Sequence, residues 1–185
     1  VKKEVTGDPY TGNESFTFTL DEDAGNNKSG YSMPTDKTTT ATNGKTGSFD
    51  AIQFTEIGDY YFTITESKGS ASGMAYDTDA KYAKVAVTEN ADGKTLDTAV
   101  TYGTSTNSCN DKSLTVTNTY AKASYTPKVK KVVSGAPDET YYFTLKDTSA
   151  DKSGESGVTT SASVRGAGTA SFGTIKYSDA GTYTS

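Results

Sequence analysis

The sequence has no histidine, no tryptophan, only four prolines and a single cysteine among its 185 residues. Without histidine the chain cannot form a Ser-His-Asp or Cys-His catalytic group, and it lacks the commonest general base and the imidazole ligand of zinc sites. These absences argue against a conventional hydrolase. The single cysteine, Cys109, excludes a disulfide within the chain, and its polar surroundings predict an exposed thiol without a special role.

Long apolar runs and an excess of positive charge are also missing. No stretch reaches the roughly 18 consecutive apolar residues that a membrane-spanning helix needs. The formal net charge is −5 and no basic patch accompanies the aromatic residues, so nucleic acid is not an expected partner. No signal peptide is visible, and the first residues already have the pattern of a strand, so we expect a mature or excised fragment.

The residues that are present favour β-structure. Tyrosine occurs 13 times and phenylalanine 7 times, and these aromatics alternate with Thr, Lys or Asp in short runs bounded by turn sequences such as GDP and ADGK. Such alternation is typical of strands that bury one face, and we therefore predict an all-β fold. The segment 21–46 is rich in Gly, Ser and Thr, and we expect loop there with at most a short extra element. The predicted strands are residues 1–5, 14–20, 47–55, 59–66, 81–89, 96–103 and 113–120.

An internal repeat divides the chain. The segment VKKEVTGDPYTGNESFTFTLDE at 1–22 matches VKKVVSGAPDETYYFTLKD at 129–147, and GKTGSFDAIQFTEIGDYYFT at 44–63 matches GTASFGTIKYSDAGTYTS at 168–185. Both copies have the order strand, turn, strand, long polar loop, strand, turn, strand. The predicted parts are a complete β-sandwich at 1–121, a short linker at 122–128 and the N-terminal part of a second, homologous sandwich at 129–185.

The second copy stops in the strand where the first copy continues. Everything that corresponds to residues 63–121 is missing from it. A sandwich without those strands exposes sheet edges and core. We expect a truncated second domain, and the alternative is a strand donated by another molecule.

Three polar residues interrupt apolar rows in the first copy. In the first predicted strand, VKKEV, alternation places Lys3 on the same face as the two valines. In DYYFTITE it places Glu66 on the face of the inward aromatic and isoleucine residues, and in SLTVTNTY it places Asn118 with leucine, valine and tyrosine. Burying an amine, a carboxylate and an amide separately is costly, so we expect the three side chains to meet.

Together these residue types suggest one reaction. Burial favours the neutral amine of a lysine and the protonated form of a carboxylic acid. A neutral lysine amine is a nucleophile, and an asparagine amide is an electrophile when its carbonyl is polarised. A protonated Glu66 would donate to the carbonyl of Asn118 and carry the proton as ammonia leaves. The product is an isopeptide bond between Lys3 and Asn118, which requires no cofactor and no metal.

The motifs that carry these residues resemble those of the streptococcal pilin isopeptide-linkage (FctA-type, CnaB-like) domains of Gram-positive pili and surface stalks. They are the opening KKEVTG, with Lys3 four residues before Gly7, then YYFTITE and the closing TVTNTY. The order Lys, Glu, Asn along the chain also matches that family. The resemblance covers residues 1–121 fully and 129–185 in part. It implies tandem Ig-like, CnaB-like β-sandwich domains, the second one incomplete.

The resemblance also implies a role for each residue and for the chain. Lys3 and Asn118 would form the cross-link and Glu66 would promote it in a single autocatalytic turnover, so the protein would not be an enzyme. The chain would be a structural module of a pilus backbone or adhesin stalk, outside the cell on the bacterial surface. Its partners would be neighbouring pilin or stalk modules, joined by a sortase. The main alternative is an adhesin domain that binds a host glycan or protein through its long loops.

Some lysine assignments stay open. Lys2 competes with Lys3 as the reactive amine, and alternation favours Lys3. Lys131 aligns with Lys3 in the second copy, but no glutamate or asparagine occupies the matching positions there, so we expect Lys131 to carry no such bond. Lys128, in YTPK, is either a lysine used for pilus assembly or a linker residue.

Other kinds of site are less favoured. DEDAGNN at 21–27 and DTDAK at 77–81 contain acidic residues that suggest calcium, but the bidentate glutamate of an EF-hand is not in place, so polar loops are expected. The tyrosines suggest a sugar-binding face, although their spacing fits core positions better. Gln53 is the only glutamine and lies in mid-chain, which argues against a Thr–Gln ester link.

Overall fold

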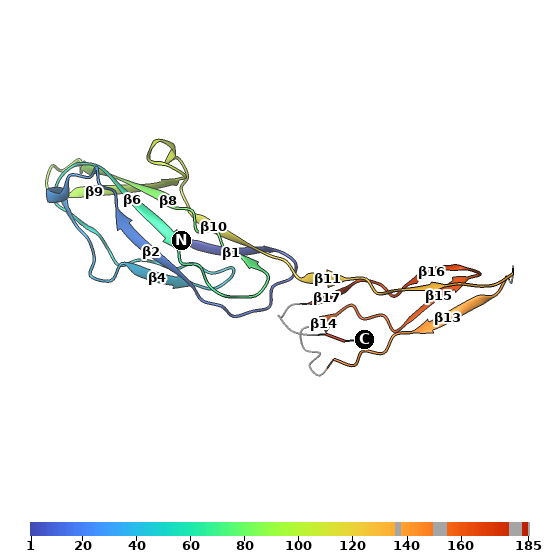
Figure 1. Ribbon diagram of the computed structural model, residues 1–185. Coiled ribbons are helices and arrows are strands. Elements are labelled where there is room, and N and C mark those ends of the chain that lie inside the picture. The colour runs from blue at the N-terminus through green and yellow to red at the C-terminus, as the bar shows by residue number, and fades with distance from the viewer. Residues whose placement is uncertain (136–137, 150–154, 178–182, 185) are drawn as a thin grey trace. The chain divides into compact units, whose positions relative to one another are not determined.

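The computed structural model describes residues 1–135, 138–149, 155–177 and 183–184 (Figure 1). The chain divides into two compact units, Val1–Tyr120 and Ala121–Ser185. Among the described residues the regular elements are strands, apart from two short 3₁₀ helices, η1 (Lys28–Gly30) and η2 (Thr106–Ser108). The predicted all-β fold is confirmed. Within the described part of the chain, no helix has the length and apolar character needed to cross a membrane.

The first unit contains a five-stranded antiparallel sheet. Its spatial order is β4-β2-β6-β8-β9, so β6 lies at its centre between β2 and β8. In β2, β6 and β8, buried apolar or aromatic residues alternate with more exposed ones, which gives each of these strands a buried and a wet face. The strands are β2 (Phe16–Glu22), β4 (Thr38–Ala41), β6 (Gly58–Glu66), β8 (Lys81–Glu89) and β9 (Leu96–Gly103).

The second sheet of this unit joins the beginning of the chain to the end of the unit. Strand β1 (Lys2–Gly7) runs parallel to β10 (Thr115–Tyr120), beside which it lies in Figure 1. The short β7 (Met74–Ala75) pairs with the C-terminal end of β10. A further pair, β3 (Tyr31–Ser32) with β5 (Gln53–Phe54), lies outside both sheets. Parallel strands need a long crossover connection, and here the rest of the unit lies between β1 and β10 in sequence.

The core is formed by the facing sides of the two sheets. The inward positions of β2 and β6 are almost fully buried, and the outward positions between them carry threonine and other polar residues. Aromatic rings dominate this core and meet edge to face, as Tyr31 and Phe62 do with ring centroids 5.4 Å apart. The buried apolar residues of the unit include Phe16, Phe18, Leu20, Tyr31, Tyr60, Phe62, Ile64, Val85, Val87 and Val116.

Two segments differ from the sequence prediction. Of the strand predicted at 47–55, only Gln53–Phe54 is strand, because Phe49 and Ile52 both pack on the core at a spacing of three, which one face of a strand does not provide. The segment 21–46, predicted as loop with at most a short extra element, contains η1, β3 and β4, and β4 pairs with β2 at the edge of the sheet. The sequence of β4, TTTA, has no apolar alternation to reveal it.

The described residues of the second unit form three small sheets with four strand pairings. Strand β17 (Ile175–Tyr177) lies between β11 (Ala123–Tyr125) and β14 (Glu155–Ser156), β12 (Lys128–Lys131) pairs with β16 (Gly168–Ser171), and β13 (Thr140–Thr144) pairs with β15 (Ser161–Arg165). The segment 122–128, predicted as a linker, thus contains β11. Among the described residues of the second unit few apolar side chains are buried, and these include Ala170, Phe172 and Ile175.

The core analysis predicts a large loss of stability for Phe62→Ala, because Phe62 is fully buried between the sheets. Truncation of a buried phenylalanine costs about 3–5 kcal/mol. Val100→Ala is the control, since Val100 is 42% exposed on the edge strand β9, and its cost should stay below about 1 kcal/mol. Urea denaturation of both variants measures the difference, and equal losses would contradict the assigned core.

Candidate functional site

Lys3 is buried between the two sheets of the first unit. Its exposed fraction is 0%, as the alternation of β1 predicts, and its Nζ donates a hydrogen bond to Oε2 of Glu66 over 2.7 Å. The ring of Phe16 lies beside the amine, with its centroid 4.6 Å from Nζ. Lys2, the competing lysine, faces the opposite way and pairs with Glu4 at the surface. The structure therefore brings Lys3, and not Lys2, into the core.

Glu66 connects the two sheets. It is the last residue of β6, at the end of the aromatic inward row, and is 2% exposed. One carboxylate oxygen, Oε2, accepts from Lys3 Nζ, and the other, Oε1, accepts from Nδ2 of Asn118 over 2.6 Å. A single carboxylate therefore contacts the amine of one strand and the amide nitrogen of another.

Asn118 completes the cluster from β10 and is fully buried. In the pairing of β10 with β1, Asn118 lies opposite Val5. Lys3 lies opposite Val116, two residues before Asn118. Its carbonyl oxygen Oδ1 accepts a hydrogen bond from the backbone N–H of Asp77 over 2.8 Å. The sequence predicted a donor from Glu66 to this oxygen; in the structure Glu66 accepts from the amide nitrogen instead, and Asp77 supplies the donor.

Burial sets the electrostatics of the cluster. Desolvation lowers the pKa of Lys3, and the hydrogen bond and charge of Glu66 oppose this shift without cancelling it. At a given pH, the neutral and nucleophilic form of the amine is therefore more populated than in an exposed lysine. Among the described residues, no buried side-chain nitrogen or oxygen lacks a hydrogen-bond partner.

The geometry suits an acyl transfer from the asparagine amide to the lysine amine. The nucleophile and the leaving nitrogen each contact one oxygen of the same carboxylate, which can take a proton from the first and deliver it to the second. The carbonyl between them is polarised by a fixed backbone donor. All the groups come from this chain, and none of the steps needs a metal or cofactor.

The side chains of other residues singled out in the sequence make their contacts outside this cluster, although the backbone N–H of Asp77 bonds to Asn118. Lys131, at the end of β12, has its Nζ 4.2 Å from the ring centroid of Tyr141, which repeats the lysine-over-aromatic contact of the first unit. Asp23 accepts from the backbone of Gly25 in its own turn, and Asp77 pairs with Lys81. Across the described residues, no three His, Cys, Asp or Glu side chains gather as a possible metal site.

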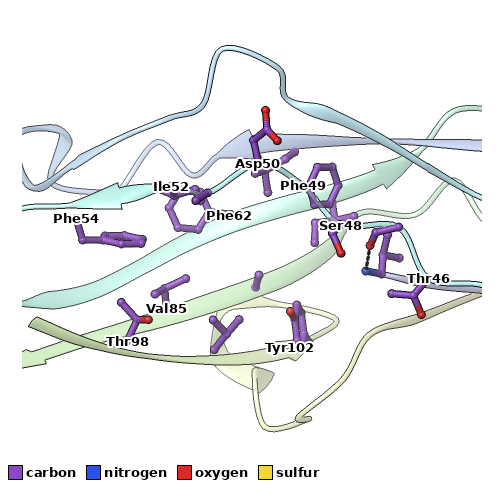
Figure 2. Close-up of a pocket in the computed structure, with 17 residues that line it drawn as sticks. Thr46, Ser48, Phe49, Asp50, Ile52, Phe54, Phe62, Val85, Thr98 and Tyr102 are labelled. Atoms are coloured by element: carbon purple, nitrogen blue, oxygen red, sulfur yellow. Dashed lines mark hydrogen bonds between the residues drawn. The ribbon is translucent and has the colours of Figure 1, made fainter.

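A separate cavity of about 490 Å³ opens beside the core (Figure 2). The segment 46–54 covers it on one side, and residues of β8 and β9 such as Val85 and Thr98 line the other. Val1 and Ile64 also line it, each two residues before a member of the cluster. Lys3, Glu66 and Asn118 themselves do not line the cavity, so the cluster is closed within the core.

Comparison with known proteins finds a family model that matches the chain. A family model described as a Spy0128-like isopeptide containing domain (FctA) matches residues 1–121 and again residues 127–184. A comparison with curated proteins finds no significant match.

Solved structures share the fold. The major pilin from Streptococcus pyogenes matches with a TM-score of 0.53 at 17% sequence identity, over 96% of this chain and 75% of that chain. An asparagine-to-alanine variant of that pilin matches with a TM-score of 0.54 at 15% identity, over the same shares of the two chains. These neighbours are of the Ig-like β-sandwich type, in agreement with the predicted fold class.

The lowered pKa of Lys3 predicts a pH dependence in a chain that keeps its free amine, such as Asn118→Ala. Because the pKa of Lys3 in the folded chain lies below its ordinary 10.5, the unfolded chain binds more protons in the interval below 10.5. The free energy of unfolding should therefore rise with pH in that interval.

Urea denaturation from about pH 7 to about pH 10 measures this rise. The control is the double variant Lys3→Met with Asn118→Ala, which has no buried amine and should show a smaller rise. If both variants have the same pH profile, Lys3 does not have a lowered pKa in the folded chain.

Proposed function

This chain belongs to the FctA family of Spy0128-like isopeptide containing domains, and from that premise we propose that it is a self-cross-linked structural segment of a bacterial surface pilus or stalk. The observation that carries the proposal is the buried cluster of Lys3, Glu66 and Asn118. In it an amine and an amide share one carboxylate at 2.7 and 2.6 Å.

The proposed reaction joins two side chains and releases ammonia. Nζ of Lys3 attacks Cγ of Asn118, and Glu66 takes a proton from the attacking nitrogen. Glu66 then delivers that proton to Nδ2, the bond between Cγ and Nδ2 breaks, and ammonia leaves. One C–N bond forms and one breaks, without change of oxidation state. The reaction occurs once in each chain, so the product is a structural protein and not an enzyme.

The position of the bond explains its structural value. It joins the first strand, β1, to the last strand of the unit, β10, which are parallel neighbours. Closing a loop of this length, on the order of 100 residues, with a covalent link stabilises a domain by about 4–5 kcal/mol in the chain-entropy account of disulfides. A force applied through the two strands would pass along the bond and leave the other strands of the sandwich unloaded.

The family and the fold support a place outside the cell. The similar solved structures are major pilins of a streptococcus, and we extend to this chain a role as one module among neighbouring pilin or stalk modules on a Gram-positive surface. Assembly by a sortase, with Lys128 as a candidate acceptor, belongs to the same proposal. Lys131 should remain unlinked in this chain, since the described residues give it an aromatic neighbour but no carboxylate or amide partner.

The first test is the intact mass of the denatured chain. We expect the parent to be lighter than its sequence mass by one ammonia, about 17 Da, and Glu66→Ala to have the full mass, because it cannot transfer the proton. The matched control is Lys2→Ala, which should lose ammonia like the parent. Fragment spectra should place the link between the peptides of Lys3 and Asn118, and a parent of full mass would refute the proposal.

The second test is mechanical. In single-molecule pulling from both ends, the cross-linked first unit should resist extension, because about 115 residues lie inside the covalent loop. In Glu66→Ala the same residues should extend and add about 400 Å of contour length, at roughly 3.5 Å per residue. An equal contour length in the two chains would show that the bond does not carry the load.

A further inference from the structure

Formation of the proposed bond between Lys3 and Asn118 is favoured by a hydrogen-bond donor to the oxygen of the amide under attack. We infer that the backbone N–H of Asp77 is this donor and acts as the oxyanion hole of the cross-linking reaction. The inference rests on the proposed function and assigns a catalytic group that no motif of the chain reveals.

The hydrogen bonds of the Asn118 amide indicate that the N–H of Asp77 is the donor to its oxygen. Both oxygens of Glu66 accept hydrogen bonds, one from the lysine amine and one from Nδ2 of Asn118. The N–H of Asp77 lies 2.8 Å from Oδ1, on the opposite side of the amide from the carboxylate. In the part of the chain that the structure describes, this is the hydrogen bond by which Oδ1 is held. Hydrogen bonds therefore hold the amide at both its oxygen and its nitrogen.

The segment that carries Asp77 is anchored to the strand that carries Asn118. Just before Asp77, β7 pairs with the end of β10 at Met74 and Ala75. The hydroxyl of Tyr76 donates to Oε1 of Glu14 over 2.6 Å and accepts from the backbone N–H of Ala71. Burial and this bond to Glu14 raise the pKa of Tyr76 to about 12, so the phenol remains a donor. These contacts fix the position of the Asp77 N–H relative to Oδ1.

The side chain of Asp77 is turned to another partner. Its carboxylate pairs with Nζ of Lys81 at 2.9 Å and accepts from the backbone N–H of Asp79. The negative charge of Asp77 is therefore balanced by Lys81 near a site where negative charge develops. The backbone donor and the side chain of Asp77 have separate functions, which makes them separable by experiment.

The N–H of Asp77 would stabilise the negative charge that forms on Oδ1 during the reaction. When Nζ of Lys3 adds to Cγ, the π electrons of the carbonyl move to Oδ1, which becomes negatively charged in a site without solvent. A fixed N–H dipole in such a site stabilises the charge without reorganisation. When the C–Nδ2 bond breaks and ammonia leaves, the electrons return from Oδ1 to restore the carbonyl, now part of the new amide. The N–H of Asp77 remains bonded to the same oxygen throughout.

The test removes this N–H and leaves the side chain in place. In the full chain made by cell-free translation, the α-hydroxy analogue of aspartate at position 77 replaces the backbone N–H by an ester oxygen. The matched control is the same analogue at Asp92, whose N–H donates within an exposed turn. Asp77→Asn is a second control, because it keeps the N–H and removes the charge that pairs with Lys81.

The readout is the rate at which the denatured chain loses about 17 Da in samples quenched over time. Loss of one oxyanion donor slows such reactions about 100-fold or more, so we expect that slowing for the ester at 77. The ester at 92 should react at the parental rate, and Asp77→Asn within about tenfold of it. An ester at 77 that reacts at the parental rate overturns the inference and leaves the proposed function standing. A parent chain that never loses ammonia refutes the proposed function itself.

A second measurement decides the case in which the ester chain does not fold, which circular dichroism would show. In the Lys3→Met variant the cluster cannot react, and amide hydrogen exchange of Asp77 can be followed by NMR. We expect exchange at least about 100-fold slower than in an unstructured peptide, as for a buried and bonded N–H. Exchange at the rate of an open loop would overturn the inference.

Discussion

The burial of one lysine amine between two sheets is the constraint on which the rest of the first unit depends. An amine at this depth is tolerated only with a partner that replaces its lost hydration. Glu66 provides that partner from the opposite sheet, at 2.7 Å. The two sheets must therefore close with the end of β6 against β1. A slip of β1 by one residue would bring Lys2 inside and turn the valines of this strand toward solvent, so the pairing fixes the register as well.

The same constraint explains why first and last strands are neighbours. Parallel pairing of β1 with β10 places Lys3 and Asn118 on one face of the smaller sheet, while β6 presents Glu66 from the larger one. Each of the three residues comes from a different strand, and two of these strands are far apart in sequence. A link at this point closes the sandwich where a disulfide would serve in a cysteine-rich protein. The chain, with one cysteine, has no such option within itself.

Two kinds of group hold the cluster together, a side-chain carboxylate and a backbone N–H. The carboxylate of Glu66 accepts from the lysine and amide nitrogens, which are the attacking and the leaving nitrogen of the proposed reaction, and a backbone N–H holds the amide oxygen. The nearby cavity contributes none of these groups, although its lining includes Val1 and Ile64 from the same inward rows. The three side chains of the cluster are all buried in the core, as the proposed reaction between the protein's own side chains requires.

The sequence by itself determined the elements and the faces of their residues. Alternation in three strands identified Lys3, Glu66 and Asn118 as inward residues, because side-chain direction in a strand depends only on position along it. The motifs also indicated the family that the comparison then showed. Tertiary structure decided the rest. The strand β4, with the sequence TTTA, is formed by pairing with β2, and the irregular path of 47–55 follows from packing of Phe49 and Ile52. The amide of Asn118 is oriented by the backbone N–H of Asp77. Every residue except proline carries such an N–H, so no sequence pattern could identify this donor.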